Sequence, residues 1–227
     1  VPTTLLGQLD SGLGGKTGMN LAGGKNLVGA FHRPEAVVCD TEVLKTLPPR
    51  ERVSGLGEAL KYGLAFDPPL WRLMTREWDA LAAGDARLVE EVVRRCASWK
   101  RKVVALDPRE TEGPRELLNF GHTLGHALEA ISKYGKYLLG EAISIGQVAA
   151  ARLSARRLGL SATDTGRIQG LFDRAGLPTT VRLSAGQRAR LWAAMKLDKK
   201  VSSGEIKFVL ARRIGEVAWG QQVPQAE

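Results

Sequence analysis

The sequence predicts a mainly α-helical fold, a helical bundle with a few short strands, and three observations lead to it. Apolar residues recur every three or four positions through most of the chain after residue 49, the period of a helix with one buried face. Proline, serine and aspartate stand at the starts of these segments, where helices open or are capped. The composition, 44% hydrophobic and 25% charged over 227 residues, suits a globular protein with a sizeable core. We expect a glycine-rich segment over residues 1–48 and an α-helical domain over residues 49–227.

The glycine-rich segment is expected to be irregular until it reaches one short strand. Residues 7–29 contain eight glycines, a density typical of loops. Residues 36–39 form a short apolar run that predicts a strand, and Pro48 and Pro49 then interrupt the chain.

Seven helices and a hairpin are expected after this segment. Apolar spacing predicts the first helix over residues 50–65. The other helices follow from opening prolines, capping side chains and glycine stops: residues 68–81 opened by Pro68, a long helix capped by Asp85, residues 114–131, residues 141–159, a helix from Ser161 to about Gly176, and a helix from Ser184 to about Asp198. Alternating apolar residues from 206 to 219 predict a terminal hairpin that turns within residues 212–216.

The charge and cysteine content exclude several classes of protein. The net charge is +9, but the basic residues are dispersed and the 6% of aromatic residues do not alternate with them, so we expect no nucleic-acid partner. No apolar run approaches the roughly 20 residues that span a bilayer, and no signal peptide is visible, so no membrane partner is expected. Two cysteines without a paired motif, Cys39 and Cys96, suit a reducing, cytoplasmic location.

The densest cluster of chemically active side chains is Arg115, Asn119, His122 and His126. Their steps of 4, 3 and 4 residues place all four on one face of a helix. Two histidines one turn apart are able to bind a metal, although the HExxH form is absent because Thr123 follows His122. The spacing is equally consistent with one buried, hydrogen-bonded histidine and one surface histidine.

A second cluster is Glu58 and Lys61, which share a helix face at a spacing of three. An ordinary surface ion pair would explain them. The flanking glycines at 55, 57 and 63 weaken a helix by roughly 1 kcal/mol each relative to alanine and point instead to a close approach of another group.

The glycine-rich segment also carries basic residues in an open backbone. Residues 10–17 resemble a P-loop but fail it, because Asp10 stands where a glycine is required. Lys16 and Lys25 each follow paired glycines, which suits an anion-binding loop, with a flexible linker as the alternative. Together with Lys100, Arg115 and the pair Lys199 and Lys200, they predict a pocket for a doubly anionic small molecule.

The blocks that carry these residues closely resemble the 3-dehydroquinate synthase family. They are residues 1–6, 10–11, 14–17, 24–26, 29–31, 44–51, 55–63, 117–126 and 198–200, in family order, with one extra residue in the loop before Arg115. The resemblance implies the C-terminal helical domain of that family and the junction segment before it. It also implies conversion of 3-deoxy-D-arabino-heptulosonate 7-phosphate to 3-dehydroquinate and phosphate in the shikimate pathway. NAD and a divalent metal, zinc or cobalt, are implied as cofactors, and a homodimer as a possible assembly.

The resemblance also implies residue roles. Metal ligands are Glu58 and His122, and substrate contacts are Lys61, Lys100, Arg115, Asn119, His126, Lys199 and Lys200. Contacts to the cofactor or its junction with substrate are Thr3, Thr4, Asp10, Lys16, Lys25, Asn26, Val43, Leu44, Lys45 and Thr46.

Two departures from the family pattern bear on activity. Leu139 stands where the family has a third metal-binding histidine, and leucine offers no donor, so zinc should bind far more weakly. The family's NAD-binding strands and their glycine loop do not precede Val1, and the first methionine is Met19, so the chain reads as beginning in mid-protein. We therefore expect this chain by itself to be inactive or nearly so. Alternatives are a related cyclase of the 2-deoxy-scyllo-inosose synthase type and a non-catalytic helical module.

Overall fold

The computed structural model describes residues 1–227 except 22–23, 112, 133–134, 199–205 and 225–227, and leaves undescribed the side chains of residues 20, 24–27 and 198. Within the described part, eight α-helices and two small hairpins confirm the mainly helical fold. The helices are α1 (Pro49–Ala65), α2 (Pro68–Arg76), α3 (Trp78–Ala83), α4 (Ala86–Leu106), α5 (His122–Ile131), α6 (Leu139–Leu158), α7 (Ala162–Arg174) and α8 (Ala185–Asp198). The strands are β1 (Met19–Leu21), β2 (Gly24–Val28), β3 (Lys207–Arg213) and β4 (Glu216–Gln222). Short π and 3₁₀ turns cover Gly7–Ser11, Thr41–Thr46 and Pro114–Asn119.

Helix boundaries follow the capping residues that the sequence offers. The side chain of Asp85 accepts a hydrogen bond from the Leu88 amide at 3.0 Å and starts α4, and Ser161 does the same for α7. Gly159, in a left-handed conformation with φ of 76°, ends α6. These predicted boundaries are confirmed.

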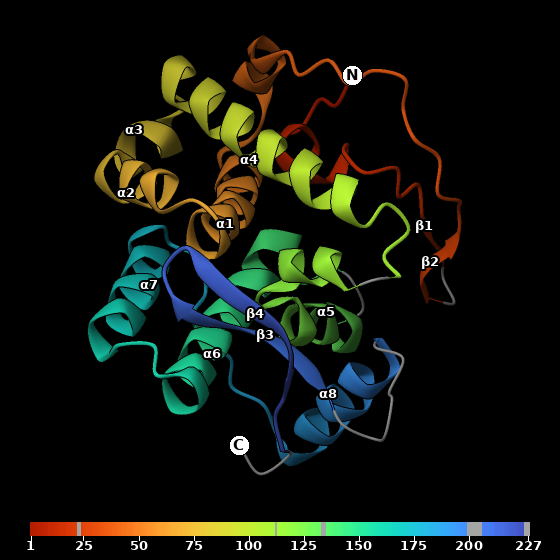
Figure 1. Cartoon of the computed structure of the whole chain (residues 1–227), viewed down its shortest axis with the longest axis vertical. Helices are drawn as coiled ribbons and strands as arrows, with labels where there is room; N and C mark the ends of the chain where they lie inside the picture. Colours follow the sequence, from red (N-terminus) through yellow and green to blue (C-terminus); the bar gives the residue numbers. More distant parts are fainter. Residues whose placement is uncertain (22–23, 112, 133–134, 199–205, 225–227) are drawn as a thin grey trace.

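Helix α1 forms the centre of the molecule. All twelve residues from Ser54 to Ala65 are buried, because α2, α3, α4 and α6 surround them (Figure 1). The main core extends from α1 to the β3–β4 hairpin. A second apolar cluster joins α5, α6 and α8 through residues such as Leu128, Ile145 and Leu191. None of the described helices combines the length and the apolar character that crossing a membrane requires.

The terminal hairpin is confirmed. Strands β3 and β4 pair antiparallel, and the turn between them includes Gly215, whose φ is 95°. The Gly215 amide donates to the Leu64 carbonyl at 2.6 Å, and the Ala211 amide donates to the Ser154 hydroxyl at 2.8 Å. These bonds fix the hairpin against α1 and α6.

The predicted helix over residues 114–131 is wrong as a single helix. A 3₁₀ turn, Pro114–Asn119, is separated from α5 by Phe120 and Gly121. Gly121 has φ of 80°, and a Cβ at that position would lie 2.5 Å from the Gln147 amide nitrogen of α6. The close approach of α6 therefore requires a glycine here, and its left-handed conformation interrupts the helix.

Smaller corrections concern the first half of the chain. The predicted helix over 68–81 divides into α2 and α3 at Glu77. The glycine-rich residues 7–29 contain a π turn and the β1–β2 hairpin rather than loop alone. The predicted strand at 36–39 is wrong, since this stretch pairs with no strand among the described residues and Val38 is 59% exposed.

The crossing of α1 and α6 predicts a sharp contrast between two glycines. A Cβ at Gly140 would lie 1.9 Å from the Ser54 carbonyl oxygen, whereas a Cβ at Gly166 in α7 meets nothing within 4 Å. We expect Gly140→Ala to lower the free energy of unfolding by about 2–3 kcal/mol through overpacking. Gly166→Ala, the control, should raise it by about 0.5–1 kcal/mol through helix propensity. Urea denaturation measures both, and equal effects would contradict the close crossing.

Candidate active site

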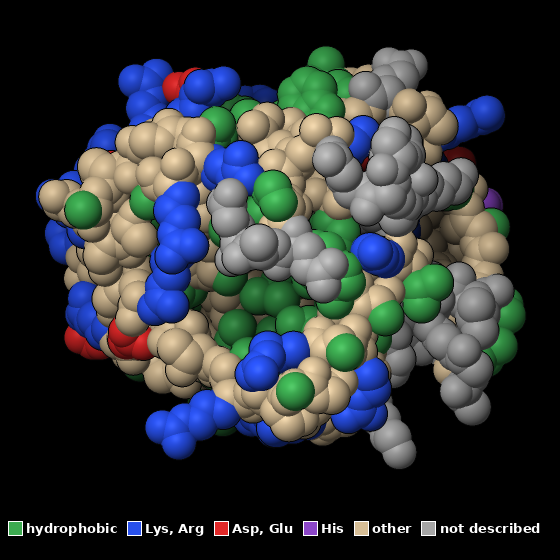
Figure 2. Space-filling model, turned by 90° about the horizontal axis from the view of Figure 1, so that it is seen from below, with side chains coloured by type: hydrophobic (Ala, Val, Ile, Leu, Met, Phe, Trp, Pro, Cys, Tyr) green, Lys and Arg blue, Asp and Glu red, His purple; other side chains and the backbone are tan. Residues whose placement is uncertain are grey.

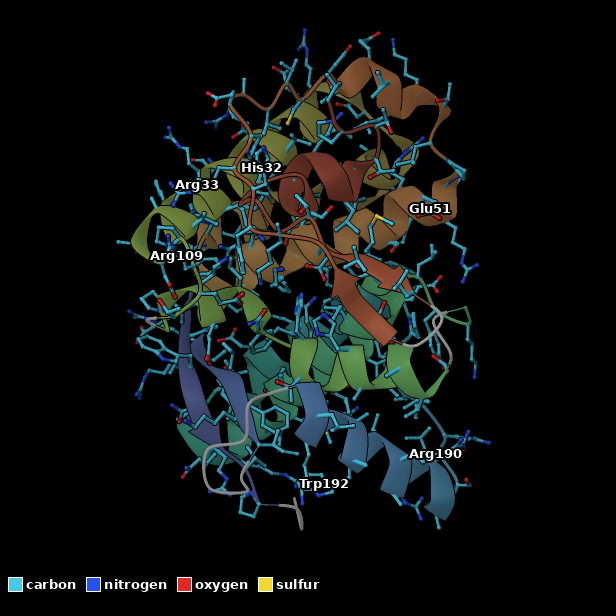
Figure 3. The ribbon with its side chains drawn as sticks, turned by 90° about the vertical axis from the view of Figure 1, so that its right-hand side faces the viewer. His32, Arg33, Glu51, Arg109, Arg190 and Trp192 are labelled. Carbon is cyan, nitrogen blue, oxygen red and sulfur yellow. The ribbon has the colours of Figure 1, made fainter. Side chains whose placement is uncertain are left out.

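A cavity of about 570 Å³ lies where the glycine-rich segment meets α4 and α5. Figure 3 looks onto this side of the molecule, where the glycine-rich segment passes α5 and continues through His32 and Arg33 beside α4. Chemically active lining residues are Asp10, Lys16, Lys100, Glu110, Asn119, His122 and His126. The structure thus brings together six of the residues that sequence reasoning assigned, and adds Glu110.

A chain of four buried charges lies beside the cavity. The Lys61 ammonium is 2.9 Å from an Asp10 oxygen and 2.6 Å from a Glu58 oxygen. Lys100 binds the other Asp10 oxygen. The charges alternate as Glu58, Lys61, Asp10, Lys100, so the set is neutral when all four are ionised. The sequence alternative of a surface Glu58–Lys61 pair is wrong, because both side chains are 1% exposed.

Each ionisation state follows from burial and its neighbours. Burial opposes ionisation of Asp10, but Lys61 and Lys100 outweigh it and hold the pKa of Asp10 well below its usual range. Burial likewise acts against the Lys61 ammonium, yet Asp10 and Glu58 outweigh it, so the pKa of Lys61 lies above its ordinary value. For Glu58 burial prevails over Lys61, and its pKa is raised. Of the two carboxylates in this set, Glu58 is therefore the less well satisfied by the described residues.

His122 faces the unsatisfied atom of Glu58. Its Nε2 lies 3.6 Å from Glu58 Oε1, and that buried oxygen forms no hydrogen bond with a described residue. The Nδ1 atom lies 3.2 Å from the Phe120 carbonyl, which only accepts, so Nδ1 carries the proton and Nε2 its lone pair. Burial lowers the pKa of His122 well below its ordinary value, which keeps the ring neutral. The His126 ring stands edge-on, 5.1 Å away.

These two side chains present donors of the kind that a divalent metal uses. A neutral imidazole fixed by a backbone carbonyl and an unpaired carboxylate oxygen are what a divalent metal requires from two of its ligands. A third donor is missing, since the described residues contain no group of three His, Cys, Asp or Glu side chains arranged for a metal. Glu141 does not replace it, because Arg50 binds both of its oxygens at 2.7 and 2.8 Å. The donor set present therefore does not fit tightly held zinc.

Leu139 occupies the first position of α6, next to the helix crossing that carries Glu58. The following residue, Gly140, donates its amide to the Ser54 hydroxyl of α1 at 3.0 Å. The start of α6 is thus fixed one turn from Glu58.

Arg115 has a different place from the one its spacing predicts. Its side chain, within a residue that is 1% exposed, donates to the Pro108 and Gly14 carbonyls, both at 3.0 Å, and does not line the cavity. The prediction that Arg115 and Asn119 share a helix face with the histidines is wrong, because no single helix carries all four residues. The 3₁₀ turn ends at Asn119, and α5 begins only after Gly121. Arg115 instead ties the glycine-rich loop to the loop before Pro114.

The remaining assigned residues are placed only in part. Thr4 accepts a hydrogen bond from the Gly7 amide, Leu44 is buried, and Lys45 pairs with Glu42, all away from the cavity lining. Thr3 and the turn residues Val43 and Thr46 likewise do not line it. Lys25 and Asn26 belong to β2 but their side chains are not described, and Lys199 and Lys200 lie outside the described residues.

Two charged residues of the site escaped sequence reasoning. Asp107, 1% exposed, binds the amides of Thr111 and Gly113, and Glu110 forms an ion pair with Lys16. The signal was present in the chain as the step Asp107-Pro108 with Gly113 five residues later, residue types that are typical of a side-chain-stabilised turn.

Basic side chains are scattered over the face that Figure 2 shows, with no continuous stripe across it. This arrangement agrees with the interpretation of most of the net charge as a solvated surface.

Comparison with known proteins gives a consistent result over the whole chain. Residues 1–54 match the N-terminal model of 3-dehydroquinate synthase and residues 55–201 match its C-terminal model. Among solved structures, 2-epi-5-epi-valiolone synthase from Streptomyces hygroscopicus subsp. jinggangensis 5008, with NAD⁺ and Zn²⁺ bound, aligns at a TM-score of 0.90 and 28% identity over 99% of this chain and 62% of that one.

A second similar structure is 2-deoxy-scyllo-inosose synthase with carbaglucose-6-phosphate, NAD⁺ and Co²⁺. It aligns at a TM-score of 0.85 and 26% identity over 100% of this chain and 64% of that one. The chain thus spans less than two thirds of the length of both solved proteins.

The buried charges predict a pH-dependent cost for Asp10→Asn. Removing this carboxylate leaves two buried ammonium groups short of a partner, so we expect a loss of about 3 kcal/mol in unfolding free energy at pH 7. Because the folded pKa of Asp10 is depressed, its contribution is present above the unfolded pKa of about 4 and is lost as the pH falls below it. The difference between the two proteins should therefore shrink at acid pH. Asp79, which forms an exposed ion pair with Arg174, provides the control. Asp79→Asn should lower the unfolding free energy by less than about 1 kcal/mol. A similar loss for both variants in urea denaturation would contradict the buried network.

The incomplete donor set predicts a gain from Leu139→His. A third donor, an imidazole nitrogen at the start of α6, should tighten zinc binding by about a hundredfold or more, measured by competition with a coloured chelator. Leu138→His adds the same side chain one residue earlier and should leave the affinity unchanged. Equal zinc affinity of the original chain and Leu139→His would show that position 139 is not the missing ligand.

Proposed function

Since the chain belongs to the 3-dehydroquinate synthase family, whose structural neighbours are sugar-phosphate cyclases, we propose that it forms the substrate-binding part of such an enzyme. The reaction we propose is conversion of 3-deoxy-D-arabino-heptulosonate 7-phosphate to 3-dehydroquinate and phosphate. The observation that supports it best is the neutral buried network of Glu58, Lys61, Asp10 and Lys100 beside a polar cavity.

The described residues suit an anionic sugar derivative. Lys16 and Lys100 supply positive charge at the cavity wall, and Asn119 and His126 supply hydrogen-bonding groups for hydroxyl oxygens. Lys61 and Arg115, which lie behind the wall, hold the carboxylate of Asp10 and the loop carbonyls in place. We propose that they position the site and that the residues at the wall contact the substrate. Lys199 and Lys200 remain proposed substrate contacts by resemblance.

NAD and a divalent metal are the proposed cofactors. Both solved relatives carry NAD⁺, one with Zn²⁺ and the other with Co²⁺. A metal bound between Glu58 and His122 would act as a Lewis acid toward substrate oxygens. Because that site offers two donors, we propose that this chain retains the metal weakly and that its turnover is correspondingly low.

A related cyclase reaction is the alternative. Carbaglucose-6-phosphate, present in one relative, carries a phosphate but no carboxylate, whereas the heptulosonate substrate carries both. Binding both anionic groups needs two separate cationic regions. Lys16 and Lys100 line the described cavity. If both lysines bind the same anionic group, the related cyclase reaction fits better.

Phosphate release separates these functions. The chain is extended with the NAD-binding part of a family member and assayed with NAD and zinc on the heptulosonate phosphate and on glucose 6-phosphate. We expect release from the heptulosonate phosphate, at a rate at least about tenfold higher in Leu139→His than in the original sequence. Leu138→His is again the control and should give no gain.

Release from glucose 6-phosphate alone would support the related cyclase. Release from neither substrate, even with Leu139→His and bound zinc, would identify a non-catalytic module.

A further inference from the structure

An ion pair closes one side of the cavity. Lys16, from the glycine-rich loop, binds Glu110, from the loop after α4, and both residues line the cavity. The Lys16 side chain is 49% exposed and that of Glu110 is 26% exposed. The pair is therefore within reach of any ligand that enters.

The backbone at Glu110 is unusual. It has φ of 59°, a left-handed conformation that glutamate adopts rarely and at a cost of about 1 kcal/mol or more. Among the described residues it is the one non-glycine with positive φ. Such strain persists only where surrounding contacts fix it, and it is concentrated at functional sites.

Two buried charged residues fix the loop that carries Glu110. The Asp107 carboxylate accepts hydrogen bonds from the Thr111 and Gly113 amides at 2.9 and 3.1 Å, and the Asp107 carbonyl accepts one from Glu110 itself at 3.3 Å. Arg115 holds the Pro108 carbonyl at 3.0 Å. The loop is thus built to hold a carboxylate at this position.

The lysine side of the pair is equally fixed. Gly14, with φ of 94°, gives its carbonyl to Arg115, and the His32 amide donates to the Gly15 carbonyl at 2.8 Å. Lys16 itself forms a β-bridge with Phe31. Arg115 therefore contacts both loops, and the ion pair joins two anchored segments across the cavity.

An ordinary surface ion pair does not account for this arrangement. Exposed pairs contribute about 0–1 kcal/mol, which would not offset a left-handed glutamate held by two buried charges. Lys100, the other lysine at the described cavity wall, is bound to Asp10, a buried partner. Glu110, the partner of Lys16, is more exposed, so a ligand is able to displace it.

We propose that Glu110 is an affinity-determining residue, a counter-ion that an anionic ligand group must displace from Lys16. This inference rests on the proposed function, in which the ligand carries a phosphate. A dianion gains about twice the attraction of a monoanion to Lys16 but displaces the same carboxylate. Glu110 thereby lowers the affinity of the cavity for every anion, and a phosphate dianion retains enough attraction to Lys16 to displace it.

Inorganic phosphate at about pH 8, where it is mainly a dianion, tests the proposal by calorimetric titration of the whole chain. Glu110→Gln keeps the shape and removes the charge, and it should tighten phosphate binding about fivefold. Glu116→Gln removes the same charge six residues away, outside the cavity lining, and should change nothing. The gain should vanish in a Lys16→Met background and shrink at 1 M salt.

A second variant guards against an effect of altered folding. Glu110→Gly removes both the charge and the strain, so it should match Glu110→Gln in phosphate affinity with no loss of thermal stability. Unchanged affinity in both Glu110 variants, or an equal gain in Glu116→Gln, would overturn the proposal whether or not sugar phosphates are turned over. Tighter phosphate binding without any sugar-phosphate turnover would leave the counter-ion role standing and count against the proposed function alone.

Discussion

The burial of the Lys61 ammonium is the constraint on which the site depends. A charge that is 1% exposed is tolerated only with partners at hydrogen-bonding distance, and two carboxylates provide them from different parts of the chain. Glu58 comes from the same helix, whereas Asp10 comes from the glycine-rich segment and also binds Lys100 of α4. Asp10, the partner of both lysines, thus fixes α1, α4 and the glycine-rich segment relative to one another.

A second buried cation organises the cavity's edges in the same way. Arg115 reaches two loop carbonyls from a short 3₁₀ turn and brings Lys16 and Glu110 face to face. Functional side chains at the cavity wall are therefore supported by charges that do not reach it. Among the described residues the buried charged side chains are three basic and four acidic ones, so the basic excess lies outside the core.

The sequence was sufficient where local chemistry decides the structure. Capping by Asp85 and Ser161 and apolar spacing located most helices, and the family blocks located Glu58 and His122. It was insufficient where a distant segment decides. The break at Gly121 depends on the approach of α6, and the apolar run at 36–39 has no strand beside it among the described residues.

The buried network is tested most directly by a double-mutant cycle between Asp10 and Lys61, in which the unfolding free energy of each variant is measured. If the buried network holds as described, Lys61→Met should be strongly destabilising in the original chain and much less so after Asp10→Asn. We expect a coupling energy of about 2 kcal/mol or more between the two sites. Additive losses, within about 0.5 kcal/mol, would show that the two side chains do not depend on each other and would contradict the account.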